Sequence, residues 1–300
     1  MKVAVLGASG MLGSTVLDVF REAPEFDVRV TARHGAMENS PPGIEVALLD
    51  ASTASRSDLA RALDGCAWAV NCIGVIKHHI RDQQADTTER AIRVNALFPH
   101  LLAEAAKVAG CKVVQIATDC VYSGAKGSYL ESDPHDALDV YGKSKSLGEV
   151  FAPSMHHLRC SIIGPELKDC RSLLEWFLGH PRGSRVPGYS NHHWNGVTTL
   201  HFARICLGIM REDLALPHLC HVIPGDILAK GELLEAVRRS FGREDLQVDL
   251  QPAPQAVDRS LATSDPALNR RLWAAAGYLD PPTLAGMVEE LAVRTRSGRR

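Results

Sequence analysis

The stretch 2-KVAVLGASGMLG-13 joins a short apolar run to a glycine-rich turn and the start of an amphipathic segment. The run 2-KVAVL-6 is typical of a strand buried on both faces. Gly7 suits a tight turn, Gly10 lets a pyrophosphate approach the backbone, and Gly13 lets helix and strand pack closely. The positive end of the helix dipole attracts the same anion. The spacing GxxGxxG directly after a first strand therefore predicts a dinucleotide-binding turn.

Similar apolar runs recur along the first half of the chain, and amphipathic segments separate them. This alternation favours an α/β fold, a Rossmann-type doubly wound parallel sheet with a smaller C-terminal substrate lobe. We expect Gly110 to end one helix and Thr198 to cap another. The predicted strands are 27–31, 44–49, 67–72, 112–117, 155–160 and 218–223, and the predicted helices include 11–22, 93–110 and 198–212. We expect a cofactor-binding domain over 1–162 with a return segment over 197–222, and a lobe from 163–196 and 223–300.

The composition excludes several classes of function. Lys and Arg number 33 and Asp and Glu 35, so the net charge of −2 predicts no nucleic-acid or anionic-membrane partner. No apolar run reaches the roughly 18–20 residues of a membrane span. The eight cysteines form no CxxC pair and predict free thiols in a reducing cytoplasm. The adjacent histidine pairs at 78–79, 156–157 and 192–193 lack metal-ligand spacing, so no metal is expected.

The residues after the second strand, 31-TARHG-35, choose between the two nicotinamide dinucleotides. An NAD site usually has an acid here, and this stretch has none. Arg33 is placed to pair with the 2′-phosphate of NADP, although an exposed surface arginine is the alternative. Asp50, after the third strand, could accept a hydrogen bond from adenine or could cap a helix. The stretch predicts NADP(H) as cofactor.

Tyr141 and Lys145 lie four residues apart in 139-DVYGKSKSLGEV-150, so on a helix their side chains share one face. A nearby ammonium stabilises a phenolate and should lower the Tyr141 pKa from its usual value near 10. Tyr141 could then give a proton to a carbonyl that receives hydride. Thr118, at the end of the fifth strand, could hold the same oxygen. Alone, the pair could equally be a solvated lysine beside a half-buried tyrosine.

The sequence resembles the extended short-chain dehydrogenase/reductases, with specific motifs over about the first 165 residues and a fainter likeness to the end of the chain. The motifs that carry the resemblance are 7-GASGMLG-13, 71-NCIG-74, 94-VNA-96, 117-ATDCVYSG-124, 141-YGKSK-145 with Gly148-Glu149, and 159-RCSIIGP-165. Two of them, GMLG and TDCVYSG, are most similar to the dTDP-4-dehydrorhamnose reductase branch. Members of that branch reduce the 4-keto group of a nucleotide-linked deoxysugar with NAD(P)H.

The resemblance implies roles for individual residues and a nucleotide-sugar substrate. Thr118, Tyr141 and Lys145 would be catalytic. Asn95 would relay protons or, equally, bridge helix and strand. The sequence leaves open whether the protein forms a homodimer. The residues implied along the cofactor are Gly7, Ser9, Gly10, Met11, Leu12, Arg33, Asp50, Asn71, Cys72 and Ile73, with Tyr141 and Lys145.

Cys120 opens an alternative function. Relatives that dehydrate nucleotide sugars carry a catalytic glutamate at this position, whereas relatives that epimerise and reduce a GDP-linked keto sugar carry a cysteine. Cys120 could therefore transfer a proton at carbon, or it could be a small buried thiol, which we prefer. The epimerising relatives have a histidine after 164-GP-165, where this chain has none before His180. A third class, a non-catalytic NADP-binding regulatory protein, would not need the Thr118, Tyr141 and Lys145 set.

Candidate substrate residues are spread over two parts of the chain. The segment 75–86 follows the fourth strand and should overhang the active site, so Lys77 or a histidine there is expected to touch substrate. In 186-VPGYSNHHWNGVTT-199, Trp194 could stack on a base or sugar and Asn195 could bind hydroxyls. Both could instead serve the packing of the lobe. Arg182 and Arg185 are candidates for the substrate's diphosphate, or are surface arginines.

Overall fold

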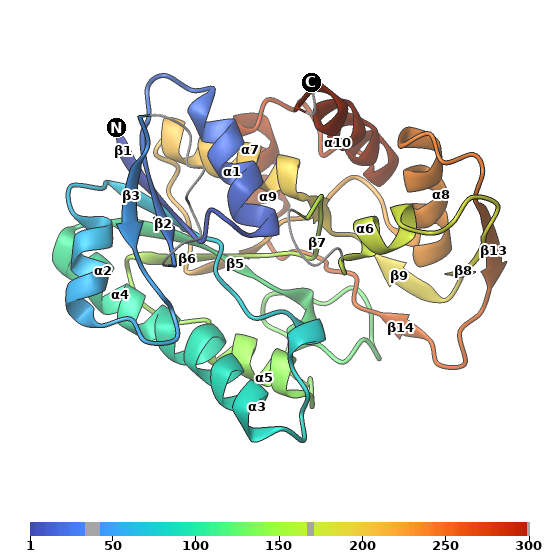
Figure 1. The fold of residues 1–300 in the computed structure, drawn as a ribbon, viewed down its shortest axis with the longest axis horizontal. Coiled ribbons are helices and arrows are strands. Elements are labelled where there is room, and N and C mark those ends of the chain that lie inside the picture. Colours follow the sequence, from blue (N-terminus) through green and yellow to red (C-terminus); the bar gives the residue numbers. More distant parts are fainter. Residues whose placement is uncertain (34–42, 167–170, 299–300) are drawn as a thin grey trace.

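The computed structural model describes residues 1–33, 43–166 and 171–298, and within them seven parallel strands form one sheet (Figure 1). The strand order is β3-β2-β1-β4-β5-β6-β11. The order reverses beside β1, as in a doubly wound fold. The prediction of a Rossmann-type parallel sheet is confirmed. The strands are β1 (Lys2–Leu6), β2 (Asp27–Ala32), β3 (Glu45–Leu48), β4 (Trp68–Asn71), β5 (Lys112–Ala117), β6 (Met155–Arg159) and β11 (Leu219–His221).

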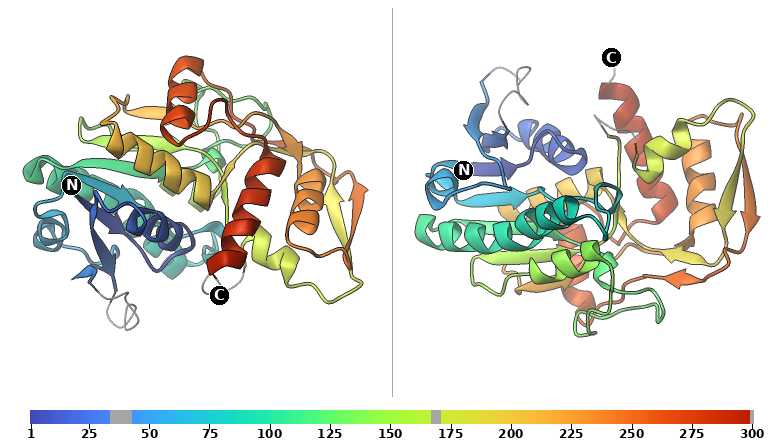
Figure 2. Two further views of the ribbon diagram at one scale, coloured as in Figure 1. Left: turned by 90° about the horizontal axis from the view of Figure 1, so that it is seen from above. Right: turned by 60° about the horizontal axis from the view of Figure 1, so that its bottom comes forward.

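Helices cover both faces of this sheet (Figures 1 and 2). On one face α1 (Met11–Arg21) packs against α7 (Thr199–Arg211), and α7 packs against α9 (Pro266–Ala275). On the other face lie α2 (Arg56–Leu63), α4 (Phe98–Ala109) and α5 (Val140–Leu147). Two separate apolar clusters correspond to these two faces. Because the strands are parallel, their carboxyl ends lie along one edge of the sheet.

Local sequence explains where the helices of the sheet layers begin and end. The Thr198 hydroxyl accepts a hydrogen bond from the His201 amide, so Thr198 caps α7 as predicted. Gly110 ends α4 with a φ of 65°, the left-handed conformation that glycine adopts without strain. Ser55 caps α2 in a reciprocal pair with Asp58. Asp50 therefore does not cap that helix; its carboxylate accepts hydrogen bonds from the amide and hydroxyl of Ser52.

The helical stretch before β5 is longer and less regular than the sequence predicts. We expected a helix from residue 93. The structure begins it with α3 (Ala85–Ala91), continues through a π-helical segment η2 (Ile92–Leu97) and ends it with α4. Apolar periodicity does not reveal a π segment, because one widened turn only shifts the pattern by a residue. Two short 3-10 turns, η1 (Lys77–His79) and η3 (Asp119–Val121), follow β4 and β5.

The rest of the chain builds small sheets and helices beside the main sheet (Figure 2). Helix α8 packs on α10, whereas α9 lies against α7 of the sheet layer. The division at residues 162, 196 and 223 stays a prediction. The elements are the pair β7 (Ile162–Ile163) and β10 (Val197–Thr198), the pair β8 (Arg185–Tyr189) and β13 (Gln247–Gln251), the triplet β12 (Leu228–Ala229), β9 (His192–Trp194) and β14 (Val257–Asp258), and the helices α6 (Leu173–Leu178), α8 (Lys230–Ser240) and α10 (Leu284–Gly298).

Two sequence predictions about the whole chain can be compared with the described residues. The seven cysteines among them are free thiols, and Cys170 lies outside the described ranges. None of the described helices has the length and apolar character needed to cross a membrane.

Candidate active site

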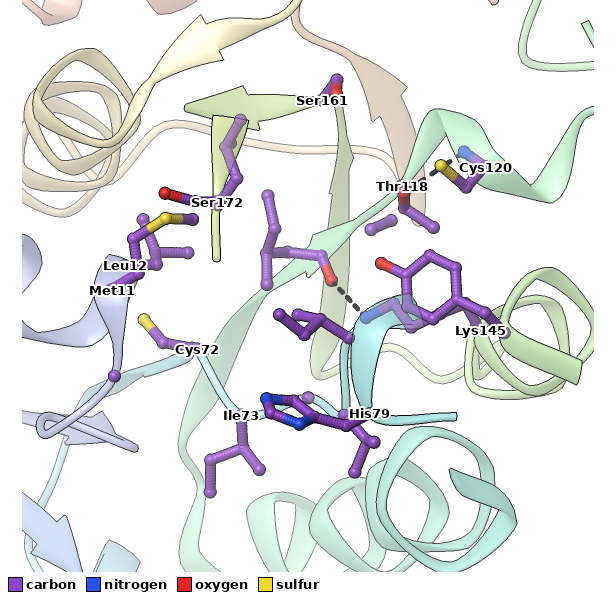
Figure 3. A pocket seen from close by; sticks show the side chains of 18 of the residues that line it. Met11, Leu12, Cys72, Ile73, His79, Thr118, Cys120, Lys145, Ser161 and Ser172 are labelled. Carbon is purple, nitrogen blue, oxygen red and sulfur yellow. Dashed lines mark hydrogen bonds between the residues drawn. The ribbon is translucent and has the colours of Figure 1, made fainter. Parts of the chain in front are cut away.

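A cavity of about 560 Å³ lies along the carboxyl ends of the parallel strands (Figure 3). One end is formed by Ser9, Gly10, Met11 and Leu12, which follow β1 and open α1. The other end is formed by the three predicted catalytic residues, Thr118, Tyr141 and Lys145. The glycine turn and the predicted catalytic set, which lie more than a hundred positions apart in the sequence, therefore face one common space.

The turn after β1 is shaped by close backbone approaches. Gly7 has a φ of 82°, and a Cβ there would lie 2.7 Å from Cγ1 of Ile73. A Cβ on Gly13 would lie 2.2 Å from the Gly7 carbonyl oxygen, so only glycine lets α1 pack on its own turn. Gly10 differs, because its nearest neighbour would be 3.4 Å away and its φ is −91°. Among the described residues, only the Gly7 carbonyl oxygen would lie within 4 Å of that Cβ, which leaves the space beside Gly10 open to a ligand.

Thr118 stands at the junction of β5 and the 3-10 turn η3. Its hydroxyl oxygen accepts a hydrogen bond from the Cys120 amide at 3.2 Å, and its hydroxyl proton is directed to the Asp119 carboxylate at 3.2 Å. This local cap holds the loop as it leaves the strand and keeps Thr118, Asp119 and Cys120 on the cavity wall. The predicted hydroxyl donor is thus fixed by its neighbours in sequence.

Helix α5 carries Tyr141 and Lys145. Asp139 begins the helix by accepting a hydrogen bond from the Gly142 amide at 2.7 Å. The ammonium of Lys145 lies on the cavity wall and donates to the Ile116 carbonyl at 3.2 Å, the bond drawn dashed in Figure 3. The predicted arrangement, with both side chains on one face of a helix, is therefore present in the structure.

Burial dominates the ionisation of this end of the cavity. It raises the pKa of the Tyr141 phenol and lowers the pKa of the Lys145 ammonium. The sequence-based expectation that Lys145 lowers the Tyr141 pKa is wrong for the chain alone, because desolvation of the phenolate outweighs the favourable contact with Thr118. Burial also raises the pKa of the Cys120 thiol to about 12, and the Asp119 charge adds to this. Tyr141 and Cys120 therefore both keep their protons at neutral pH.

Small residues let α5 approach the rest of the site. A Cβ on Gly142 would lie 2.5 Å from the Cys120 carbonyl oxygen, and one on Gly148 would lie 1.9 Å from the Asn95 carbonyl oxygen. The amide group of Asn95 binds both backbone groups of Val75, at 2.8 and 2.9 Å, and donates to Ser144 at 3.2 Å. Asn95 thus bridges the loop after β4 to α5, which fits the structural alternative for this residue.

Arg159, at the end of β6, holds the far end of α5 in place. It is fully buried, and each of its five N–H groups has an acceptor. Nε and Nη2 donate to the carboxylate of Glu149, which follows α5. Nη1 donates to the Tyr122 hydroxyl at 2.6 Å and to Nε2 of His221 at 2.9 Å, and Nη2 also donates to Nε2 of His135 at 2.8 Å. One guanidinium therefore joins four other segments of the chain.

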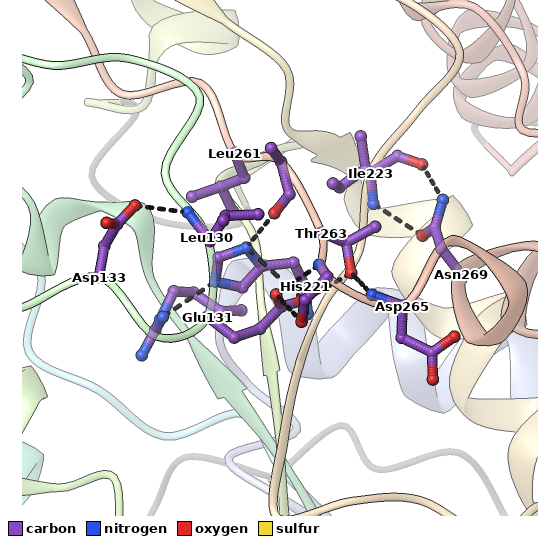
Figure 4. A network of polar contacts seen from close by, with 12 residues as sticks. Leu130, Glu131, Asp133, His221, Ile223, Leu261, Thr263, Asp265 and Asn269 are labelled. Atoms are coloured by element: carbon purple, nitrogen blue, oxygen red, sulfur yellow. Dashed lines mark hydrogen bonds and ion pairs between the residues drawn. The ribbon is translucent and has the colours of Figure 1, made fainter.

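The acceptors of Arg159 extend this network to the C-terminal part of the chain. Because a guanidinium only donates, Nε2 of His221 must accept, and its Nδ1 donates to the Ala262 carbonyl at 2.6 Å. The His221 amide donates to Glu131, whose carboxylate also binds Thr263 and Ser264 (Figure 4). Residues 131 and 262–264 are thereby fixed beside the sheet edge that carries the cavity.

Several predicted site residues do not line the cavity. Asn71 is buried, and its amide is engaged with Gln115 at 2.9 Å and with the Ile73 amide at 3.1 Å. The Lys77 ammonium pairs with Asp139 at 2.7 Å. The side chain of Asn195 is buried and binds both backbone groups of Leu261, at 2.7 and 2.8 Å. The remaining predicted residues outside the cavity are Gly7, Asp50, Arg182, Trp194 and Arg185, the last of which pairs with Asp249 at 2.7 Å.

Other residues line the cavity although the sequence analysis did not name them. Ser161 directly follows β6, and its position after a predicted strand is a signal that could have found it. Glu166 and Ser172 arrive from the chain beyond β7, and Arg90 arrives from α3. No local pattern marks these three. His79 also lines the cavity, as the expectation of a histidine in the segment 75–86 allowed (Figure 3).

The predicted cofactor residues that do face the cavity form a continuous wall. They come from the ends of β1, β2 and β4 and from α5. Within the described ranges, no group of three or more His, Cys, Asp or Glu side chains is placed to hold a metal ion. The predicted residues on this wall are Ser9, Gly10, Met11, Leu12, Arg33, Cys72, Ile73, Tyr141 and Lys145.

Comparisons with known proteins agree with this arrangement. A dTDP-4-dehydrorhamnose reductase from Clostridium acetobutylicum is similar over 99% of this chain and 100% of its own, with 19% identity and a TM-score of 0.70. Another, from Bacillus anthracis in complex with NADP, is similar over 98% of this chain and 99% of its own, with 19% identity and a TM-score of 0.74. These likenesses establish the fold.

Sequence comparison identifies the family. The spore coat polysaccharide biosynthesis protein SpsK of Bacillus subtilis (strain 168) is 39% identical over 70 residues, which are 23% of this chain and 24% of that protein. The match thus spans about a quarter of that curated relative. The model of the family described as the RmlD substrate binding domain matches residues 1–163. The chain therefore belongs to the RmlD substrate binding domain family, which confirms its resemblance to the sugar-nucleotide reductases.

Proposed function

We propose that this protein reduces the 4-keto group of a nucleotide-linked deoxysugar with NADPH. One observation carries the proposal: Thr118, Tyr141 and Lys145 line the same cavity as the glycine turn at the start of α1. A regulatory protein that only binds a dinucleotide would not need this set at the far end. The relatives named above, two sugar-nucleotide reductases and a polysaccharide biosynthesis protein, support the substrate class.

The turn after β1 fits a dinucleotide. Gly10 begins α1 in an extended conformation and leaves free space where a side chain would otherwise stand. Helix amide groups that have no intrahelical partner are available to a pyrophosphate there. Ser9, Gly10, Met11 and Leu12 would hold this part of the cofactor. When bound, NADPH supplies the hydride.

The residues at the other end of the cavity would donate the proton to the substrate. Burial keeps the Tyr141 phenol protonated, which is the form that can donate to the carbonyl oxygen of a keto sugar. The Thr118 hydroxyl, on the same wall, would turn its proton from the Asp119 carboxylate to that oxygen and orient it. The ammonium of Lys145 lies on this wall too, where a positive charge would stabilise the negative charge that develops on the phenol oxygen.

The choice of NADPH rests on the end of β2. Arg33 lines the cavity there and directly follows Ala32, the last residue of β2. The position after the strand therefore carries a positive charge and not an acid. A carboxylate at this place would repel a 2′-phosphate. We expect calorimetry to show that the wild-type protein binds NADPH more tightly than NADH, and Arg33→Asp should reverse this preference. Equal binding of the two by the wild-type protein would overturn the choice.

The reductase proposal is tested with purified protein, NADPH and a panel of keto-sugar nucleotides. Tyr141→Phe should lower turnover by a factor of about 10²–10⁴, which is typical for loss of a general acid, and should leave cofactor affinity near that of wild type. Tyr189→Phe is the matched control, because Tyr189 lies on β8 outside the cavity lining. Full activity of Tyr141→Phe would end the proton-donor role. Binding of NADPH without reduction of any sugar would favour a regulatory protein.

The epimerase-reductase alternative is weakened by the state of Cys120. The thiol lies on the cavity wall, so proton transfer to a substrate carbon is within reach. A thiol whose pKa is raised to about 12 by burial is not a base at neutral pH, however. His180 points elsewhere, because its Nδ1 lies 2.9 Å from the Trp176 carbonyl. We therefore propose reduction without proton exchange at carbon.

A further inference from the structure

Two arginines from distant parts of the chain line the cavity. Arg33 directly follows β2, and Arg90 lies near the end of α3, in the crossover between β4 and β5. Both side chains are exposed. Sequence analysis predicts a role for Arg33 alone, because nothing in the sequence around Arg90 points to the nucleotide. Only the folded chain brings the second guanidinium to the same space.

In the part of the chain that the structure describes, neither the Arg33 nor the Arg90 guanidinium forms a hydrogen bond or an ion pair. A neighbour on the same helical stretch behaves differently, because Arg93 pairs with Glu89 at 2.9 Å and does not line the cavity. Arg185, on β8, is likewise paired with Asp249. Unpaired arginines at a cavity are available to an anionic ligand.

The residues beside Asp50 and Arg90 lie close together, because Ala51 packs against the apolar cluster that contains Ala91. Burial raises the pKa of the Asp50 carboxyl group, but the hydrogen bonds from Ser52 and the charges of Arg33 and Arg90 lower it overall, which agrees with both arginines lying on this side of the site. One oxygen of that carboxylate already accepts the amide and hydroxyl of Ser52. The charge of Arg33 alone would be offset by Asp50, whereas with Arg90 the group keeps a net positive charge. The second arginine therefore gives this group the net positive charge that attracts a phosphate.

The position of this group along the sheet edge selects the ligand atom. β2 and β3 lie on one side of β1, and β5, which leads to Thr118, lies on the other. The start of α1, between them, is the place for the pyrophosphate. Resting on the proposed use of NADPH, we infer that Arg33 and Arg90 together bind the 2′-phosphate of the cofactor. Arg90 would thus determine cofactor specificity from α3, whereas the glycine turn opens α1.

The inference is tested by binding, not by turnover. NADP⁺ and NAD⁺ are titrated by calorimetry into the wild-type protein, Arg90→Ala, Arg90→Lys and Arg93→Ala. Loss of a charge-assisted hydrogen bond predicts that Arg90→Ala binds NADP⁺ about 10- to 100-fold more weakly, with NAD⁺ changed less than about twofold. Arg90→Lys should recover part of the loss, since it keeps the charge without the planar fork. Arg93→Ala removes the same charge from a paired site and should change neither affinity.

Smaller probes separate the two phosphate sources that could reach these arginines. Adenosine 2′,5′-bisphosphate and AMP differ only in the 2′-phosphate, so Arg90→Ala should weaken the first and spare the second. Binding of dTDP and UDP should not change. If Arg90→Ala weakened dTDP or UDP instead, the arginine would serve the diphosphate of the substrate and the inference would be overturned.

The remaining outcomes distinguish this inference from the proposals on which it rests. A wild-type protein that prefers NADP⁺, with the preference intact in Arg90→Ala, overturns the two-arginine site alone. An equal loss for NADP⁺ and NAD⁺ also overturns it, because the contact would then be common to both nucleotides. A wild-type protein without preference overturns the choice of NADPH and the site with it. None of these results bears on Tyr141, whose role is tested by turnover.

Discussion

Arg159 binds the carboxylate of Glu149 through two parallel hydrogen bonds, from Nε at 3.1 Å and from Nη2 at 2.5 Å. The arginine is fully buried, and the glutamate side chain is 8% exposed. Removing one partner of such a pair leaves the other charge without compensation in the interior. Arg159→Met should therefore lower the free energy of unfolding by about 3–5 kcal/mol, measured by urea denaturation.

The exposed pair of Arg185 and Asp249 provides the control for Arg159→Met. Their side chains are 68% and 41% exposed, so water screens the attraction. Arg185→Met should cost less than about 1 kcal/mol. Equal effects of the two substitutions would show that the network around Arg159 adds no more than a surface ion pair.

Three buried histidines should make stability depend on pH. Burial lowers the pKa of His157, His201 and His221 to about 4 each. In the unfolded chain these groups titrate near 6.5, so between about pH 6.5 and 4 the unfolded state binds more protons than the folded state. Stability is complete above this window and is lost as the pH falls through it. The thermal midpoint should therefore fall steadily from pH 7 to pH 5.

A histidine variant identifies the source of this pH dependence. His201 is fully buried, and its Nδ1 lies 2.6 Å from the Thr198 hydroxyl. His201→Gln cannot titrate, so the slope of the midpoint against pH should become shallower between pH 6.5 and 5. An unchanged slope would assign the acid sensitivity to other groups.

Alanine substitutions at two glycines of the first turn should have different effects, one on stability and one on cofactor binding. A Cβ on Gly13 would overlap the Gly7 carbonyl, whereas one on Gly10 would meet only an ordinary contact at 3.4 Å. Gly13→Ala should therefore destabilise the fold by about 1–3 kcal/mol, as overpacking does. Gly10→Ala should keep the wild-type thermal midpoint and lose cofactor affinity, because its methyl group occupies the place of the pyrophosphate. Normal cofactor binding by Gly10→Ala would contradict the assignment of this turn.

Cys120→Ser should reduce a keto sugar nearly as well as wild type. The buried thiol is protonated at neutral pH, so it contributes no base to the reaction. The test follows the sugar protons by NMR during incubation with the enzyme and oxidised cofactor in deuterium oxide. Deuterium that enters carbon 3 or 5 with the wild-type enzyme, and not with Cys120→Ser, would establish the epimerase-reductase function instead.

The parts of the site that the sequence predicts are those fixed by their immediate neighbours. Thr118 ends a strand and caps the next turn, and Tyr141 and Lys145 share a helix face because of their spacing. Such relations need only a few consecutive residues, so a pattern can reveal them. The strands and the caps at Thr198 and Gly110 are predictable for the same reason.

The residues that the sequence misplaces depend on partners far along the chain. The sequence predicts Asn195 as a substrate ligand, but in the structure both polar atoms of its side chain bind the backbone of Leu261. Arg185 looks free until β13 brings Asp249 beside it. Arg90 is the opposite case, an arginine in an unremarkable helix that the crossover carries to the cavity. Tertiary contacts decide all three, and no local pattern encodes them.

The position of β11 at the edge of the sheet also governs how the chain folds as it leaves the ribosome. β11 pairs with β6, and α7 packs on α1, yet both elements are synthesised only after residue 198. A nascent chain that ends at residue 163 leaves the outer edge of β6 unpaired and the side of α1 that meets α7 uncovered. Unpaired strand edges and bare apolar surface favour aggregation and chaperone binding. The main sheet is therefore completed late in translation, after residues 163–196 have already emerged.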